Sequence, residues 1–296
     1  MARPITTGVD GSPESLAALH WAAREAALRA LPLRIVHAWL WQPLDVPIVQ
    51  DRDAQARSAE SLVREAATDV AGQYPDLPVT TEVVQDTAVA ALLGEAERSE
   101  LLVLGSRGHG ALLGFLLGSY GQQVIASATC PVVSVRAPAG DAQAQEETQP
   151  QDVGEIVVGQ HGSPEDSAAV LGFAFETAAA HGAAVRAVRA WSLPALYAYS
   201  PGSMRLADEA GGLEPYEKKA LEQALAPWRE RFPDVPVTEH VEIGSAGQVL
   251  LSVTSGARLL VVGRRSGRSP VGTRIGSVAH AALHHAPCPV AVVPPA

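Results

Sequence analysis

The sequence predicts two α/β domains in tandem, each built on a five-stranded parallel sheet with helices on both faces. Its length of 296 residues is about twice that of a usual single domain. Two segments also recur, because residues 75–80 return as 233–238 and residues 101–105 return as 259–263. Within each half, apolar runs alternate with segments of helical periodicity, and this alternation is typical of a mainly parallel sheet.

Five segments of the first copy have the composition of strands. Residues 101–104 are apolar throughout, as in a strand that is buried on both faces. Residues 79–84 instead alternate with threonine and glutamate, as in an outer strand. In chain order, the predicted strands are 5–9, 33–39, 79–84, 101–104 and 132–135.

Four helices are predicted between these strands. The first follows a Ser12-Pro13 start signal, and it carries leucine and alanine at helical spacing. The second has an apolar stripe formed by Leu62, Ala66 and Val70. The predicted helices are 14–30, 53–72, 88–96 and 119–128, and the second copy repeats the order of elements between residues 155 and 293.

The domain boundaries follow from composition. Residues 139–152 contain no large apolar residue and are typical of a solvated linker. We therefore predict domain 1 at 1–138, the linker at 139–153 and domain 2 at 154–296.

The offset between the copies grows along the chain, from 151 between Gly8 and Gly159 to 158 in the later elements. Trp39 recurs as Trp191 at an offset of 152, whereas residues 101–105 recur at an offset of 158. The second copy therefore carries six extra residues (158 minus 152). We place them in the loop 197–212, where prolines and glycines interrupt regular structure.

Composition and charge exclude several classes of partner. The net charge of −10 repels nucleic acid and anionic lipid. No signal region follows Met1, and no apolar run approaches the roughly 18 residues of a membrane span. We expect a soluble, cytoplasmic protein with no nucleic-acid and no membrane partner.

Cysteine and histidine give no convincing metal site. Cys130 and Cys288 each precede a proline and a strand, so we interpret both as small buried hydrophobes and expect neither a disulfide nor a zinc site. His280 and His284 have the i, i+4 spacing of metal ligands on the last helix. Because no third ligand is evident, we interpret them as surface residues of that helix.

The strongest chemical signal is a glycine loop after the fourth strand. Residues 105–119 have the pattern Gly-x2-Gly-x9-Gly-Ser. Glycines allow a sharp turn and a close approach of the backbone to a ligand, and the final Gly-Ser opens a helix whose N-terminus favours phosphate. Arg107 adds a planar fork that suits phosphate. Turn chemistry without a ligand is the alternative interpretation.

Other nucleotide fingerprints are missing from the sequence. A P-loop needs a lysine after its glycines, and the only lysines are Lys218 and Lys219. No G-x-G-x-x-G pattern follows the first strand, so the sequence does not predict a standard dinucleotide site.

Taken together, the motifs resemble the universal stress protein family. The resemblance rests on residues 8–12, residues 36–39, the glycine loop and residues 130–133, and it covers both copies. It implies flavodoxin-like or Rossmann-like domains, similar to adenine nucleotide alpha hydrolases, with strand order 3-2-1-4-5. It also implies that the domains pair through their last strands, and the retained glycines place the first copy in the ATP-binding branch.

The resemblance implies roles for individual residues of domain 1. In the ATP-binding branch, motif glycines and serine hold ribose and phosphates, the early aspartate contacts adenine, and backbone at the end of strand two lines the base. Carried onto this chain, these roles fall to Asp10, Ala38, Gly105, Arg107, Gly108, Gly118, Ser119 and Tyr120. For Asp10 a second interpretation stays open, as a cap for the helix that follows Pro13.

Domain 2 keeps part of this set. A weaker nucleotide site is predicted at Gly263, Arg265, Gly276, Ser277 and Val278. Three positions depart from domain 1, because Asp10 becomes His161, His37 becomes Arg189 and Gly108 becomes Ser266. A weakened or specialised site and an empty site both stay open.

The resemblance implies a regulatory or sensor protein of the stress response that binds ATP, with or without Mg²⁺. No residue pair fits general acid–base work, so we predict no catalytic residue. One alternative is a slow Mg-dependent ATP hydrolase or nucleotidyl transferase, and another is a ligand-free dimerising scaffold. The expected partners are an adenine nucleotide and a second copy in a homodimer, with pairing of the two domains within the chain.

Overall fold

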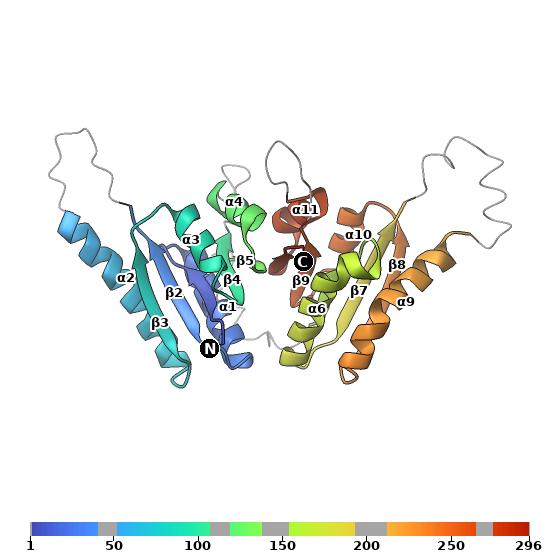
Figure 1. The fold of residues 1–296 in the computed structure, drawn as a ribbon, viewed down its shortest axis with the longest axis horizontal. Coiled ribbons are helices and arrows are strands. Elements are labelled where there is room, and N and C mark those ends of the chain that lie inside the picture. Colours follow the sequence, from blue (N-terminus) through green and yellow to red (C-terminus); the bar gives the residue numbers. More distant parts are fainter. Residues whose placement is uncertain are drawn as a thin grey trace. The chain divides into compact units, whose positions relative to one another are not determined.

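A computed structural model describes residues 2–40, 52–106, 119–137, 154–192, 212–264 and 275–295. Within these ranges the chain forms two compact units, unit 1 up to residue 137 and unit 2 from residue 154 on (Figure 1). The predicted linker 139–153 and residues 197–211 of the predicted loop lie outside the described ranges. No helix in those ranges has the length and apolar composition needed to cross a membrane.

Unit 1 is coloured blue to green in Figure 1, and its described residues alternate strands with helices. All neighbouring strands pair in parallel, in the order β3-β2-β1-β4-β5. The strands are β1 (Ile5–Gly8), β2 (Leu33–Ala38), β3 (Val79–Val84), β4 (Leu101–Ser106) and β5 (Val132–Arg136). The helices are α1 (Pro13–Leu28), α2 (Arg52–Gln73), α3 (Ala88–Ala96) and α4 (Ser119–Ser127).

Unit 2 repeats this plan, from yellow-green to red in Figure 1. Its strands also pair in parallel, in the order β8-β7-β6-β9-β10. The strands are β6 (Ile156–Gly159), β7 (Val185–Trp191), β8 (Val237–Ile243), β9 (Leu259–Gly263) and β10 (Val290–Val293). The helices are α6 (Pro164–His181), α9 (Glu214–Arg231), α10 (Ala246–Ser252) and α11 (Ser277–His285).

The predicted fold class is confirmed in both units, including the strand order 3-2-1-4-5. Two strands show why the sequence was informative. The side chains of Leu101–Leu104 in β4 are all buried, as their apolar run predicts for a central strand. The outer strand β3 exposes Thr80, Thr81 and Glu82, and these polar side chains suit a strand with an unpaired edge.

Helix α1 packs closely on the sheet because its inward face is made mostly of alanine. Ala18, Ala22, Ala23 and Ala26 are all fully buried. The predicted start signal is confirmed, since the side chain of Ser12 is the N-cap and Pro13 begins the helix. The N-terminus of α1 is thereby fixed beside the carboxyl end of β1, where ligands of open α/β sheets bind.

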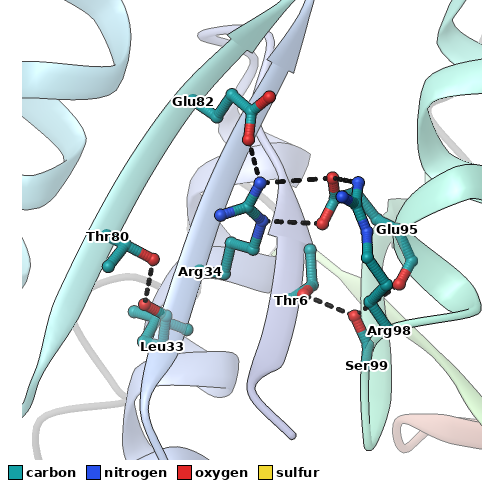
Figure 2. A network of polar contacts seen from close by, with 8 residues as sticks. All are labelled: Thr6, Leu33, Arg34, Thr80, Glu82, Glu95, Arg98 and Ser99. Carbon is teal, nitrogen blue, oxygen red and sulfur yellow. Dashed lines mark hydrogen bonds and ion pairs between the residues drawn. The ribbon is translucent and has the colours of Figure 1, made fainter.

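A polar network in unit 1 links α3 to β2 and β3 (Figure 2). The carboxylate of Glu95, only 1% exposed, accepts from Arg34 Nε at 2.7 Å and from Arg98 Nη2 at 2.6 Å. Arg34 also pairs with Glu82. Because a buried charge is costly without partners, these ion pairs let Glu95 lie in the interior.

Candidate functional site

The turn after β1 holds the carboxylate of Asp10 at the carboxyl end of the sheet. Asp10 Oδ1 accepts from the Ser12 N–H at 3.0 Å and from the Ser12 hydroxyl at 2.5 Å. Gly11 between them has a φ of +81°, a conformation that favours glycine. The sequence Asp-Gly-Ser therefore forms a tight turn that presents an exposed carboxylate at this edge.

The interpretation of Asp10 as the cap of α1 is wrong. Ser12 caps the helix, because its Oγ accepts from the Ser15 N–H at 3.2 Å. Asp10 acts one step earlier, by orienting Ser12, and its own N–H donates to Ser15 Oγ at 3.3 Å. Its carboxylate is thus positioned by the turn without occupying the cap.

The end of β2 lies beside this turn. His37 Nδ1 donates to the Val9 carbonyl at 2.7 Å, which joins the ends of β2 and β1. Ala38, the predicted base-lining residue, follows as the last residue of β2 and is half-buried. Asp10 in the turn after β1 and Ala38 at the end of β2 therefore lie at the same edge of two neighbouring parallel strands.

Gly105 has a structural reason to be glycine that the sequence did not reveal. A Cβ on Gly105 would lie 2.4 Å from the Glu14 carbonyl oxygen and 2.8 Å from the Ser15 nitrogen. The first turn of α1 therefore lies directly against β4, and no larger residue fits without a backbone shift. The motif alone assigns this glycine to a ligand, whereas the alanine-rich face of α1 is the signal in the sequence for close helix–strand packing.

The remaining predicted residues of domain 1 are described only in part. Arg107, Gly108 and Gly118 lie outside the described ranges. Ser119 is the first residue of α4, and Tyr120 in the first turn is exposed. The first turn of α4 contains no acidic residue, so no carboxylate of that turn opposes an anion at the helix N-terminus.

In unit 2 the described part of the predicted set lies at the equivalent edge. Gly276 is the N-cap of α11, with a φ of +95° and a ψ of 149°, a conformation found almost only for glycine. Ser277 and Val278 follow in the first turn, whereas Arg265 lies outside the described ranges. A Cβ on Gly263 would lie 3.0 Å from Val170 Cγ2, which is a milder contact than at Gly105.

The loop after β6 differs chemically from its counterpart in unit 1. His161 replaces Asp10 and is exposed, and Ser163 forms a capping box with Asp166. Hydrogen bonds from the Ser163 backbone and hydroxyl lower the pKa of Asp166, and the backbone N–H of Glu165 lowers the pKa of Glu165. Two carboxylates thus remain ionised in the first turn of α6.

Titratable groups elsewhere give no metal centre. In the ranges that the structure describes, no group of three or more His, Cys, Asp or Glu side chains could hold a metal ion. The surface interpretation holds for His280 but is wrong for His284, which is only 7% exposed. Cys130 and Cys288 are both buried thiols, and burial raises the pKa of the Cys130 thiol to about 11.

Comparisons with known proteins agree with this architecture. A family model described as the universal stress protein family matches residues 1–136 and 153–294. A universal stress protein of Mycobacterium tuberculosis is 33% identical over 301 residues, which cover 97% of this chain and 96% of the relative. One from Mycolicibacterium smegmatis is 31% identical over 302 residues, which cover 98% and 97%.

A solved structure supports the same fold over nearly the whole chain. The crystal structure of a universal stress protein from Archaeoglobus fulgidus matches with a TM-score of 0.65 at 16% identity, covering 98% of each chain. The family model matches twice, once in each half, which fits a tandem arrangement. The chain therefore belongs to the universal stress protein family, in its tandem two-domain form.

Proposed function

We propose that unit 1 binds an adenine nucleotide, ATP in particular, and that the protein acts as a regulatory sensor. Membership in the universal stress protein family supports a role in the stress response. The observation that carries the proposal is the position of Asp10. Its carboxylate is exposed and fixed at the end of β1, in the same unit as the Gly-x2-Gly-x9-Gly-Ser motif.

Three further features of unit 1 support a nucleotide. Asp10 follows β1 and Ala38 ends the adjacent β2, and the carboxyl ends of parallel strands are where open α/β sheets bind ligands. The backbone N–H groups that open α4 favour a phosphate, and no acidic side chain opposes it in the first turn. Arg107, Gly108 and Gly118 complete the proposed site on the basis of the sequence motif.

The decisive experiment is a calorimetric titration of nucleotide-stripped protein with Mg-ATP. We expect Gly118→Val to abolish binding, because a branched side chain blocks the phosphate from the backbone. We expect Asp10→Ala to weaken binding by roughly 10- to 100-fold, the usual worth of a hydrogen bond to a charged group. Retention of wild-type affinity in a folded Gly118→Val protein would contradict the proposal.

Two matched controls separate ligand contacts from structural effects. Gly72→Val makes the same replacement in α2, where a Cβ on Gly72 meets no neighbour, and should leave binding unchanged. Ser12→Ala removes the cap and both hydroxyl bonds of the turn but keeps the carboxylate. If Asp10 only supports the turn, Ser12→Ala and Asp10→Ala should weaken ATP binding equally.

The titration, together with an assay of phosphate release, tests the rival functions. No heat with ATP, and no competition by any adenine nucleotide, would favour the ligand-free scaffold. Phosphate release that survives purification and disappears in Gly118→Val would favour the slow Mg-dependent hydrolase. ATP binding without turnover is the outcome that the sensor proposal requires.

A further inference from the structure

Three positions of unit 2 differ together from their counterparts in unit 1. In unit 1 they are occupied by two small or apolar side chains and one imidazole, and in unit 2 by an amide, a guanidinium and a carboxylate. At offsets of 151, 152 and 158, the pairs are Val9 and Gln160, His37 and Arg189, and Ala59 and Glu217. Val9 and Ala59 are buried, and neither side chain has a polar atom.

In unit 2 these side chains form one network centred on Arg189. Arg189 Nη1 donates to Gln160 Oε1 at 2.5 Å and to the Gly162 carbonyl at 3.2 Å. Its Nε donates to Glu217 Oε2 at 2.6 Å, so the ion pair links the end of β7 to α9. The side chain of Arg189 is 16% exposed and that of Glu217 is 27% exposed, so the pair is partly shielded from water.

Gln160 anchors the other end of the network. It is 3% exposed, and its Nε2 donates to the Gly162 carbonyl and to Ser167 Oγ, both at 3.2 Å. The loop that replaces the Asp10 turn is therefore tied to β7, to α6 and, through Arg189, to α9. A satisfied and partly buried network of this kind rigidifies its surroundings.

The contrast with unit 1 lies at the edge where the base is proposed to bind. There, His37 donates only to the Val9 carbonyl among its described bonds, and the turn presents Asp10. In unit 2 the guanidinium spans from the loop to α9 at the same edge. A base entering beside Ala190, the counterpart of Ala38, would meet this guanidinium. Displacing the guanidinium would break its bond to Gln160 and leave the charges of Arg189 and Glu217 unpaired.

We infer that Arg189, held by Gln160 and Glu217, determines that unit 2 does not accept the adenine nucleotide and so confines binding to unit 1. The three residues act as specificity-determining residues, since a guanidinium held by an amide and a carboxylate occupies positions that in unit 1 carry only an imidazole and two apolar side chains. This inference rests on the proposed function, because it concerns which of two related units takes the nucleotide.

Two variants of the full chain isolate the network from the other departures of unit 2. The first carries His161→Asp and Ser266→Gly, which restore the motif residues of unit 1. The second adds Gln160→Val, Arg189→His and Glu217→Ala, which restore the three network positions. Circular dichroism checks the fold of both proteins. Stoichiometry of Mg-ATP is then measured by calorimetry.

We expect about one equivalent of ATP per chain in the wild type and in the first variant, and about two in the second. About two equivalents in the wild type or in the first variant would overturn the inference. A folded second variant that stays at about one would overturn it as well. A wild type that binds none contradicts the proposed function itself and the inference with it.

A third variant with four substitutions serves as the test if the protein with all five substitutions does not fold. It combines Arg189→His and Glu217→Ala with the two motif changes, and it keeps Gln160 bonded to Ser167 and to the Gly162 carbonyl. Both charges leave together, so no buried charge is left without its partner. We expect this variant to gain the second equivalent too, and a folded protein that fails to gain it would overturn the inference.

Discussion

Unit 1 and unit 2 have the same strand order, but different side chains stabilise the two sheets. In unit 1, Thr6 and Ser99 share a buried hydrogen bond of 2.6 Å, whereas Val157 and Ala257 stand at the equivalent positions of unit 2. Unit 1 buries the charge of Glu95 (Figure 2). The equivalent residue of unit 2 is Val253. The same parallel sheet thus accommodates either polar or apolar side chains where other segments pack on it, provided that each buried polar group finds a hydrogen-bond partner.

The helix pairs differ in the same direction, with a polar contact in unit 1 and an apolar contact in unit 2. In unit 1, α1 meets α2 through His20, which pairs with Asp69 at 3.3 Å. In unit 2, α6 meets α9 through stacked Phe175 and Trp228, with ring centroids 6.1 Å apart. Gly172 of α6 makes room for Trp228. The two units therefore place their polar and apolar contacts differently around one backbone plan.

The largest expected effect is the difference in stability loss between two substitutions at equivalent arginines, one in each unit. Arg34→Ala should destabilise unit 1 by about 3 kcal/mol, because it removes two ion pairs and leaves Glu95 buried beside the mostly exposed Arg98. Arg186→Ala should cost unit 2 less than about 1 kcal/mol, because its pair with Glu155 is about one-third exposed. Hydrogen exchange of amides in β1 and β6 measures each unit within the full chain.

Equal losses in the two units would contradict this contrast. A useful control is Arg98→Ala, which removes the exposed partner of Glu95 but leaves Arg34 in place. It should destabilise unit 1 by less than Arg34→Ala does.

The next effect concerns the glycines near the carboxyl ends of β4 and β9. Gly105→Ala should destabilise unit 1 by about 2 kcal/mol, because its Cβ would overlap the backbone of Glu14 in the first turn of α1. Gly263→Ala should cost about 1 kcal/mol, since a small shift of the Val170 side chain relieves the contact. Urea titration of each variant against the wild type provides the measurement.

If Gly105→Ala were neutral for stability but weakened ATP binding, Gly105 would serve the ligand and not the packing. Gly94→Ala is a suitable control in α3, where an added Cβ meets no neighbour. It should be neutral or slightly stabilising, because alanine favours a helix over glycine.

The smallest effect lies at the ends of α1 and α6. Ala30 has a φ of +51°, the left-handed conformation that glycine adopts more readily, and its counterpart Gly182 has a φ of +59°. Ala30→Gly should therefore stabilise unit 1 by about 1 kcal/mol, and Gly182→Ala should destabilise unit 2 by a similar amount. Opposite shifts of exchange protection in α1 and α6 are the expected result, and shifts of the same sign would refute it.

The sequence alone determined the duplicated α/β plan and the positions of the elements. Apolar runs specified buried strands such as Leu101–Leu104, and Ser12-Pro13 specified where α1 begins. These signals are local, because they depend on neighbours within a few residues. The family motifs likewise predict that Asp10 and the glycine loop lie at the carboxyl edge of the sheet, since both directly follow strands.

Contacts between distant segments were decided only by the tertiary structure. The alanine-rich face of α1 brings its first turn against Gly105, ninety-one positions after Glu14 (105 minus 14). Likewise, Arg189 meets Gln160 and Glu217 from three separate elements. No local sequence pattern predicts such pairings, because the partners are far apart in the chain and meet only when it folds. The sequence therefore determined which edge of each unit carries the motif residues, and the packing of distant side chains distinguished the edge of unit 2 from that of unit 1.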